Sequence, residues 1–230
     1  PMRAGDDGLR LSLAGAQDKL PVVLDADGTR IGLPLNGSPS THILKPAIAG
    51  IDGSVFNEAF CMALARALKL DVARTSIRAI ADGEQLRHYL LVERYDRHAA
   101  KPVQRLHQED FCQALGVVSE HKYQNEGGPS LAQVFALLRS ATRPSALHTL
   151  KLLDYVVFNA LIGNHDAHGK NFSLLYTPTG AVLTPLYDAL CTAAYPALTD
   201  KMAMKIGSQY KFSEVMARHW EQFAKEAELS

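Results

Sequence analysis

The sequence predicts an α+β fold with a β-rich first part and a mainly helical second part. Short apolar runs separated by turn signals fill the first 95 residues, which is typical of strands. Longer segments with a period near 3.6 fill the rest, which is typical of helices. A polar loop at 163–171 directly follows the most apolar of these segments. We therefore expect two lobes, 1–95 and 96–230.

The first lobe is expected to hold short strands and one helix. Strands are predicted at 9–13, 20–24, 29–33, 41–45, 75–81 and 88–93, with turns at 25–28 and 82–83. In the predicted helix, apolar side chains recur every four residues, at Phe56, Phe60, Leu64 and Leu68, and Asp52 or Ser54 is the expected cap.

The second lobe is expected to be mostly helical. Helices are predicted at 108–115, 131–138, 146–162 and from about 213 onward, and strands at 172–176 and 182–184 around a turn. The segment 146–162 is the most apolar and is predicted to be the buried central helix.

Composition excludes several classes of protein. Of 230 residues, 47% are hydrophobic and 21% charged, as in ordinary globular domains, and 24 basic residues balance 24 acidic ones. Net charge therefore does not indicate nucleic-acid binding. The three cysteines lack CxxC spacing, and no apolar run reaches the roughly 18 residues of a membrane span. We expect no membrane contact, and a cytoplasmic location by default.

The two ends of the sequence are unusual. Pro1–Met2 is not a natural translation start, and the last helix stops within its pattern. The expectation is a truncated chain or, alternatively, one half of a split system.

The loop after the apolar segment carries the main chemical signal. Asp166 and Asn171 have the spacing Asp-x-x-x-x-Asn, and Asp188 follows the two predicted strands. In a kinase catalytic loop the Asp accepts the acceptor proton and the Asn binds Mg²⁺. Amide and carboxylate oxygens suit that ion, so Asn171 and Asp188 are the expected metal ligands.

By itself, the Asp-x-x-x-x-Asn spacing more often occurs in an ordinary solvated loop than in a catalytic one. The buried helix before it, the hairpin after it and the further Asp188 favour catalysis. A metal-hydrolase cluster of His165, Asp166 and His168 is an alternative, but no further His or carboxylate pair at ligand spacing completes it.

The first lobe holds candidates for nucleotide binding. Lys45 ends a predicted strand and Glu58 lies in the following helix, the order in which kinases place a phosphate-binding lysine and its tether. Backbone groups of Glu93 and Tyr95 are expected to meet an adenine edge, and Asp96 a ribose. For each, an ordinary solvated strand residue is the competing interpretation.

A loop of small residues lies between the first two predicted strands. Ala14, Gly15, Ala16 and Gln17 allow backbone N–H groups to approach a phosphate closely. This is neither a Walker A motif nor GxGxxG, and an ordinary tight turn is the competing interpretation.

Taken together, these segments resemble the HipA family, the serine/threonine kinase toxins of bacterial type II toxin–antitoxin modules. The matching motifs run in order along nearly the whole chain: SLAGAQDK at 12–19, THILK at 41–45, NE at 57–58, VERYDR at 92–97, QEDFCQA at 108–114, KY at 122–123 with GGP at 127–129, IGNHDAHGKNFS at 162–173, LTPLYD at 183–188 and KMAM at 201–204.

The resemblance implies a two-lobed protein-kinase-like fold that binds ATP and Mg²⁺ and phosphorylates protein serine, with an aminoacyl-tRNA synthetase as substrate. It implies catalytic roles for Asp166 and His168, a phosphate contact for Lys45 and autophosphorylation of Ser12. Phosphate on Ser12 would add about −1.5 to −2 charge and expel the adjacent loop from the nucleotide phosphates. A HipB-like antitoxin is the implied partner, with DNA contacted only indirectly through it.

Two other functions remain open from the residues alone. Small-molecule phosphotransferases of the aminoglycoside or choline kinase kind also use an Asp-x-x-x-x-Asn loop. HipA-family proteins carry an N-terminal subdomain before the Ser12 loop, and only eleven residues precede Ser12 here. An inactive truncated fragment that binds only antitoxin or nucleotide is therefore the other alternative.

Overall fold

The computed structural model describes residues 18–25, 27–98 and 103–229, with only the backbone of His98. The described residues divide into two compact units, one ending at Leu106 (the first unit) and one beginning at His107 (the second unit). Each unit is described by itself. The assignment of nucleotide binding to 1–95 and catalysis to 96–230 stays a prediction.

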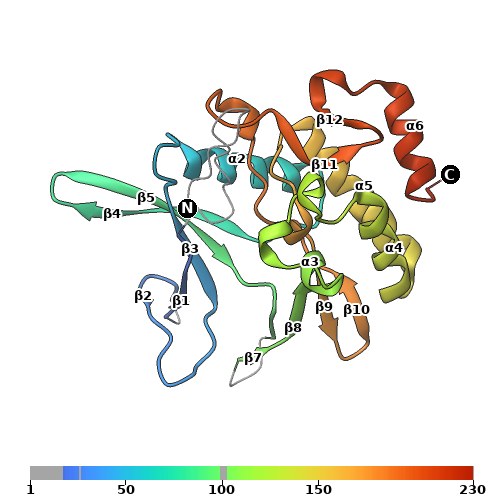
Figure 1. The fold of residues 1–230 in the computed structure, drawn as a ribbon. Coiled ribbons are helices and arrows are strands. Elements are labelled where there is room, and N and C mark those ends of the chain that lie inside the picture. Colours follow the sequence, from blue (N-terminus) through green and yellow to red (C-terminus); the bar gives the residue numbers. More distant parts are fainter. Residues whose placement is uncertain (1–17, 26, 99–102, 230) are drawn as a thin grey trace. The chain divides into compact units, whose positions relative to one another are not determined.

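The first unit is built on an antiparallel sheet in the order β2-β1-β3-β5-β4 (Figure 1). Its strands are β1 (Leu20–Leu24), β2 (Ile31–Gly32), β3 (His42–Pro46), β4 (Thr75–Asp82) and β5 (Gln85–Glu93). These strands agree with the sequence prediction, whereas the candidate at 9–13 lies outside the described residues. The central strand β3 pairs with β5 so that Lys45 lies opposite Leu90. A two-stranded ribbon of β6 (Arg97–His98) and β7 (Gln104–Arg105) follows.

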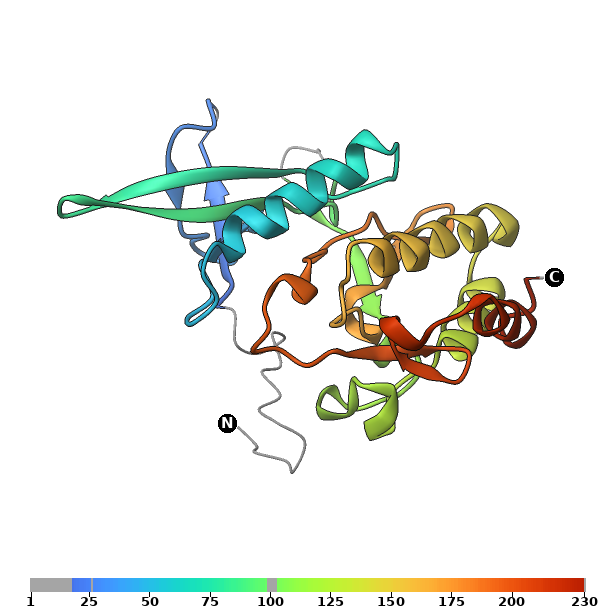
Figure 2. The same cartoon turned by 90° about the horizontal axis from the view of Figure 1, so that it is seen from above.

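Helix α2 (Ser54–Ala67) packs against β4 and β5, and Figure 2 shows it lying across that hairpin. The buried face consists of Val55, Glu58, Cys61, Met62 and Ala65 together with Ser54. These side chains are mostly small, so the helix can approach the sheet closely. The apolar stripe expected to mark the buried face points outward instead, and Phe60 is 67% exposed.

The start of α2 also differs from the expectation. The residue before the helix is Gly53, in a left-handed conformation with φ 70°, and it makes no side-chain cap. Ser54 turns inward, where its Oγ accepts a hydrogen bond from the backbone N–H of Ile48 at 2.8 Å. Neither Asp52 nor Ser54 caps the helix, because glycine closes the turn without a side chain.

The second unit contains an antiparallel sheet in the order β10-β9-β8. Its strands are β8 (His107–Asp110), β9 (Ser173–Thr177) and β10 (Gly180–Leu183). The predicted helix at 108–115 is wrong over its first half, since 107–110 pair with β9. Only α3 (Phe111–Ala114) is helical, and Asp110 and Gln113 cap it reciprocally. Pairing with a strand more than 60 residues later outweighs the local helical pattern.

Helices α4 (Leu131–Ala141), α5 (Ser145–Leu161) and α6 (Ala217–Glu226) each contribute buried side chains to this unit. Helix α4 packs against α5, and α6 packs against α4 and β11. Phe135 of α4 meets Phe223 of α6 edge to face, with ring centroids 5.6 Å apart. The hairpin of β11 (Lys201–Ile206) and β12 (Gln209–Lys211) was not predicted from the sequence. Short 3₁₀ turns complete the unit: η1 (Ser119–His121), η2 (Gln124–Glu126), η3 (Gly169–Asn171), η4 (Thr192–Ala194) and η5 (Phe212–Glu214).

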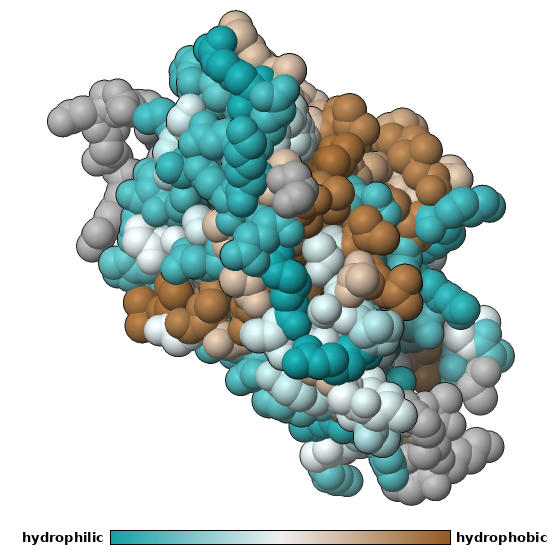
Figure 3. Space-filling model, turned by 90° about the vertical axis from the view of Figure 1, so that its right-hand side faces the viewer, coloured by the Kyte–Doolittle hydropathy of each residue, from teal (hydrophilic) through white to brown (hydrophobic). Residues whose placement is uncertain are grey.

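Helix α5 has two different faces and is not buried all round. Leu152, Tyr155 and Phe158 lie in the core, but Leu147 and Leu150 are exposed and Leu161 is 78% exposed. The expectation of a fully buried central helix is therefore wrong for its outer face. Figure 3, which views the molecule from the right-hand side of Figure 1, shows hydrophobic surface in brown next to hydrophilic surface in teal. Within the described ranges, no helix is long and apolar enough to cross a membrane.

Candidate active site

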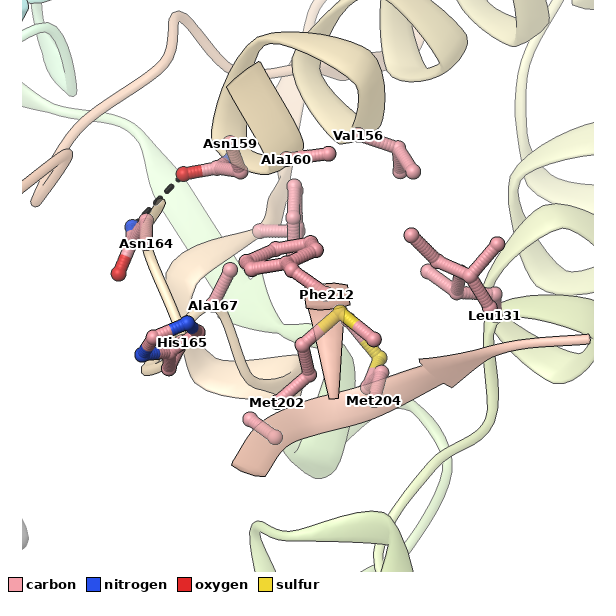
Figure 4. Close-up of a pocket in the computed structure, with 13 residues that line it drawn as sticks. Leu131, Val156, Asn159, Ala160, Asn164, His165, Ala167, Met202, Met204 and Phe212 are labelled. Atoms are coloured by element: carbon pink, nitrogen blue, oxygen red, sulfur yellow. Dashed lines mark hydrogen bonds between the residues drawn. The ribbon is translucent and has the colours of Figure 1, made fainter. Parts of the chain in front are cut away.

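The polar loop begins where α5 ends, and a series of hydrogen bonds holds its backbone. Gly163 turns the chain with φ 68°, and a Cβ at this position would lie 2.7 Å from the Cβ of Ala193. Asn164 Nδ2 donates to Asn159 Oδ1 at 2.7 Å, as Figure 4 shows, while Asn164 Oδ1 accepts from the N–H of Asp166 at 3.1 Å. The position of Asp166 is therefore fixed from the end of α5.

A second set of bonds ties the same loop to distant segments. The N–H of His165 donates to Thr192 Oγ1 at 2.7 Å, and its carbonyl oxygen accepts from the N–H of Ala203 at 2.7 Å. Behind the loop, Figure 4 shows a cavity lined mainly by apolar side chains that include Met202, Met204 and Phe212. Its volume of about 30 Å³ is room for a water-sized molecule and is too small for a nucleotide.

Asp166 lies at the centre of a group of polar and aromatic side chains. Tyr123 Oη donates a hydrogen bond to Asp166 Oδ1 at 2.6 Å. Asp166 Oδ2 lies 3.9 Å from His168 Nε2, beyond hydrogen-bond length, and the Asp166 side chain is 20% exposed. A partly accessible, well-oriented carboxylate has the geometry that a general base requires.

His168 is enclosed, with 1% of its surface exposed. Burial first, and then the charge of Lys122, lowers its pKa from 6.5 to about 3. The ring is therefore neutral near pH 7. Neither ring nitrogen has a hydrogen-bond partner among the described residues. Such an imidazole is poorly suited to shuttle protons, and the catalytic role expected for His168 stays a prediction.

Of the two predicted metal ligands, Asn171 lies just before the β9–β10 hairpin and Asp188 lies just after it. Asn171 Oδ1 accepts from the N–H of His168 at 3.1 Å, which orients its side-chain amide. Asp188 has a left-handed backbone with φ 56°, and its negative charge acts on His168 in the direction that raises the imidazole pKa. Both residues therefore belong to the surroundings of His168.

The metal-hydrolase alternative lacks support. In the part of the chain that the structure describes, no three His, Cys, Asp or Glu side chains are grouped so as to hold a metal ion. His165, Asp166 and His168 are among the described residues and form no such group.

In the first unit, Lys45 and Glu58 form a buried ion pair. Lys45 Nζ donates to Glu58 Oε1 at 2.5 Å, and the two side chains are 4% and 6% exposed. Strand β3 and helix α2 supply the partners, so both are held by regular backbone. This is the contact that the chain order predicted, although its role toward a nucleotide stays a prediction.

The other predicted nucleotide contacts of the first unit lie at the end of β5 and just after it. Burial raises the pKa of Asp96, but hydrogen bonds and charge from Arg94 and Arg97 hold it below its ordinary value overall. The carboxylate accepts from Arg94 at 2.6 and 2.9 Å. Glu93 is exposed and lies 3.8 Å from Arg74, and Tyr95 is half-buried. The adenine and ribose assignments stay predictions, and Asp96 is already engaged by two arginines.

The small-residue loop cannot be placed. Ser12, Ala14, Gly15, Ala16 and Gln17 lie outside the described residues. Their predicted roles in autophosphorylation and phosphate binding stay predictions.

Sequence reasoning gave no role to two parts of the site. One is Tyr123, which bonds to Asp166 from 43 positions away. The other is the Asn159–Asn164 pair that fixes the loop. The KY motif at 122–123 contributes only to the family resemblance, and no local signal connects it to Asp166.

These features define a class of protein before any particular relative is considered. Over the described residues the fold is α+β, with an antiparallel sheet and helix α2 in the first unit and a mainly helical second unit, as in protein kinases. The Helicobacter pylori proinflammatory kinase CtkA matches with a TM-score of 0.53 at 14% identity, over 86% of this chain and 78% of that one. At that identity the match supports the fold alone.

The sequence profile described as the HipA-like C-terminal domain matches residues 11–230. The chain belongs to this family.

Relatives agree with the assignment. The chain is 54% identical over 229 residues to the Sinorhizobium fredii protein named "Putative kinase Y4mE", covering 99% of this chain and 53% of that one. It is 32% identical to the Shewanella oneidensis serine/threonine-protein kinase toxin HipA, covering 94% of this chain and 51% of that one. A solved complex of HipA from that organism with HipB and operator DNA matches with a TM-score of 0.86 at 31% identity, covering all of this chain and 55% of that one. The chain thus spans about half the length of these relatives.

Proposed function

We propose that this chain is the ATP-binding and catalytic part of a serine/threonine protein kinase that acts as the toxin of a toxin–antitoxin module. The observation that carries the proposal is the buried Lys45–Glu58 pair. Kinases hold the lysine that contacts the nucleotide phosphates by a helix glutamate. A buried charge without its partner is strongly destabilising, so Lys45 and Glu58 each depend on the other to stay buried.

The residues of the second unit have distinct proposed roles. Asp166 accepts the proton of the acceptor hydroxyl, and the bonds of Asn164 and His165 keep its loop in place. The reaction needs little covalent chemistry from the protein, because phosphoryl transfer depends mainly on positioning and charge stabilisation. His168, buried and neutral, contributes its backbone N–H to orient Asn171.

The donor set fits a magnesium ion. Asn171 offers an amide oxygen and Asp188 a carboxylate, the hard oxygen ligands that Mg²⁺ takes together with substrate phosphates. When bound, MgATP supplies the phosphoryl group, and the metal neutralises phosphate charge. Asn171 and Asp188 would hold the metal, and Lys45 would contact the phosphates.

The antitoxin partner is proposed from a relative, and the protein substrate and the autophosphorylation site are proposed from the family resemblance of the sequence. A HipB-like antitoxin is proposed because the similar HipA structure is a complex with HipB and operator DNA. DNA would then be contacted only indirectly, through the antitoxin. An aminoacyl-tRNA synthetase is the proposed protein substrate, and Ser12 the proposed site of autophosphorylation.

The test is incubation of the chain with Mg²⁺, γ-labelled ATP and a cytosolic extract. Label in a protein band is the expected result, and a synthetase identified in that band would support the proposed substrate. Label found only in small molecules would instead indicate a small-molecule phosphotransferase.

Calorimetric titration with MgATP provides the second measurement. We expect saturable binding. If no binding occurs at millimolar nucleotide, both enzymatic interpretations are wrong for this chain. The antitoxin-binding fragment would then be the remaining interpretation.

A further inference from the structure

The phenol of Tyr123 makes a short hydrogen bond to the proposed catalytic base. Tyr123 Oη lies 2.6 Å from Asp166 Oδ1. That length is characteristic of an O–H group donating to an ionised carboxylate, a bond about twice as strong as a neutral one. Tyr123 lies 43 residues before Asp166, in a segment between two 3₁₀ turns, so chain proximity does not explain the contact.

Hydrogen bonds on both sides fix the segment that carries Tyr123. Lys170 Nζ, from the catalytic loop, donates to Ser119 Oγ at 2.7 Å. On the other side, the N–H of Lys205 in β11 donates to Gln124 Oε1 at 3.0 Å. The N–H of Gly128 closes the turn by donating to the carbonyl oxygen of Tyr123 at 2.9 Å. The phenol is therefore held in place from outside, as a positioning group must be.

The ring of Tyr123 has contacts that do not depend on its hydroxyl. It meets His168 edge to face, with centroids 5.6 Å apart. Lys122 Nζ lies 4.9 Å from the ring centroid. A phenylalanine would keep these ring contacts and lose the bond to Asp166, so the hydroxyl can be tested separately from the packing.

We propose that Tyr123 is a positioning residue for phosphoryl transfer: its phenol fixes Asp166 Oδ1 and thereby aims Oδ2 at the acceptor hydroxyl. The inference rests on the proposed function. In the transfer, the acceptor oxygen bonds to the γ-phosphorus as the bond from that phosphorus to the ADP oxygen breaks, and the acceptor proton passes to Asp166. A hydrogen bond donated to a carboxylate also favours its ionised form, the form that accepts this proton.

The kinetic test compares Tyr123→Phe, Tyr123→Ala and Tyr176→Phe with the unmodified chain, using label transfer from MgATP to protein in the extract. Tyr176 is the matched control, because its phenol donates to the Glu109 carboxylate at 2.5 Å from an exposed position on β9. Both Tyr123 variants are expected to lose roughly 10- to 100-fold in maximal rate with little change in KM for ATP. The acid limb of their pH–rate profile should move to higher pH. Tyr176→Phe should behave like the parent.

Two kinetic results would overturn the inference. If Tyr123→Phe transfers label at the parent rate while Tyr123→Ala is slower, only the packing of the ring matters. A Tyr123→Phe variant faster than the parent would mean that the phenol competes with the substrate for Asp166.

A double-mutant cycle tests the contact without requiring activity. Tyr123→Phe, Asp166→Ala and the double variant are compared in urea unfolding, and non-additive effects are expected. Additive effects would overturn the inference even in a chain that transfers no phosphate. Absence of transfer by the unmodified chain, with the cycle still non-additive, would count against the proposed function and leave the Tyr123–Asp166 contact standing.

Discussion

The Lys45–Glu58 pair and the Asp166 loop are both polar sites, but they are built in opposite ways. Lys45 and Glu58 are 13 residues apart, on a strand and the next helix, and both are almost fully buried. Asp166 is partly exposed on a loop, and its partner Tyr123 comes from another loop 43 positions away. Regular backbone places the first pair, whereas hydrogen bonds between loops place the second. Changes at the pair should therefore affect stability most, and changes at Asp166 should affect catalysis most.

The sharpest test of this difference is Asp166→Asn. It should lower phosphoryl transfer by roughly 10²- to 10⁴-fold, because the base is lost. Folding and ATP binding should be retained, since asparagine still offers an oxygen to Tyr123. Label transfer, calorimetry and urea unfolding measure the three properties. Asp154→Asn, at an exposed position on α5, is the control. Transfer at the parent rate would show that Asp166 is not the base.

Burial of His168, in the Asp166 loop, predicts that the free energy of unfolding depends on pH. Its folded pKa is about 3, against 6.5 when unfolded. Below pH 6.5 only the unfolded ring takes a proton, so the free energy of unfolding should fall as pH drops from 6.5 to 3. The maximum contribution is on the order of 5 kcal/mol, and above pH 6.5 it should be constant.

Urea unfolding at a series of pH values measures this effect. A His168→Gln variant should show a shallower fall in stability between pH 6.5 and 3. His107→Gln, at an exposed ring, is the matched control. Identical slopes for parent and His168→Gln would contradict a neutral, buried His168.

Glu58→Gln tests the buried Lys45–Glu58 pair. It leaves the Lys45 ammonium buried without its carboxylate, and the first unit should lose about 3 kcal/mol of stability. Asp82→Asn serves as the control, because its partner Arg87 and Asp82 itself are 73% and 54% exposed. That change should cost less than about 1 kcal/mol. Equal urea midpoints for the two variants would show that burial does not distinguish the pairs.

The smallest expected effect comes from the turn that holds Tyr123. A Cβ on Gly128 would lie 2.5 Å from the carbonyl oxygen of His121 and 2.7 Å from the carbonyl carbons of Lys122 and Tyr123. Gly128→Ala must shift backbone, at a cost of about 2 kcal/mol, and should lower the transfer rate by displacing Tyr123.

Gly32→Ala is the control for Gly128→Ala, since its Cβ would meet only Val23, at 3.6 Å. Unfolding and label transfer are measured for both variants. An unaffected transfer rate in a destabilised Gly128→Ala chain would show that the turn does not contribute to catalysis.

Much of the fold could be read from local pattern. Strands β1, β4 and β5 and helices α4 and α5 lie where alternation or 3.6 periodicity predicted them. The order of Lys45, Glu58, Asp166, Asn171 and Asp188 suggested a kinase, and family membership agrees with it. Each of these signals is carried by residues close together in sequence or by their order, so no long-range contact was needed to find it.

The sequence by itself thus determined the fold class, the main elements and the order of the chemical residues. Only the tertiary structure decided that 107–110 pair as a strand, that Phe56 and Phe60 face outward on α2, and that Tyr123 bonds to Asp166. In each case the outcome depends on a partner distant in sequence: β9 for the strand, the β4–β5 hairpin for the helix face, and the Asp166 loop for Tyr123. Local periodicity indicates that a face or a strand exists, but which partner it meets is set by the packing of the whole unit.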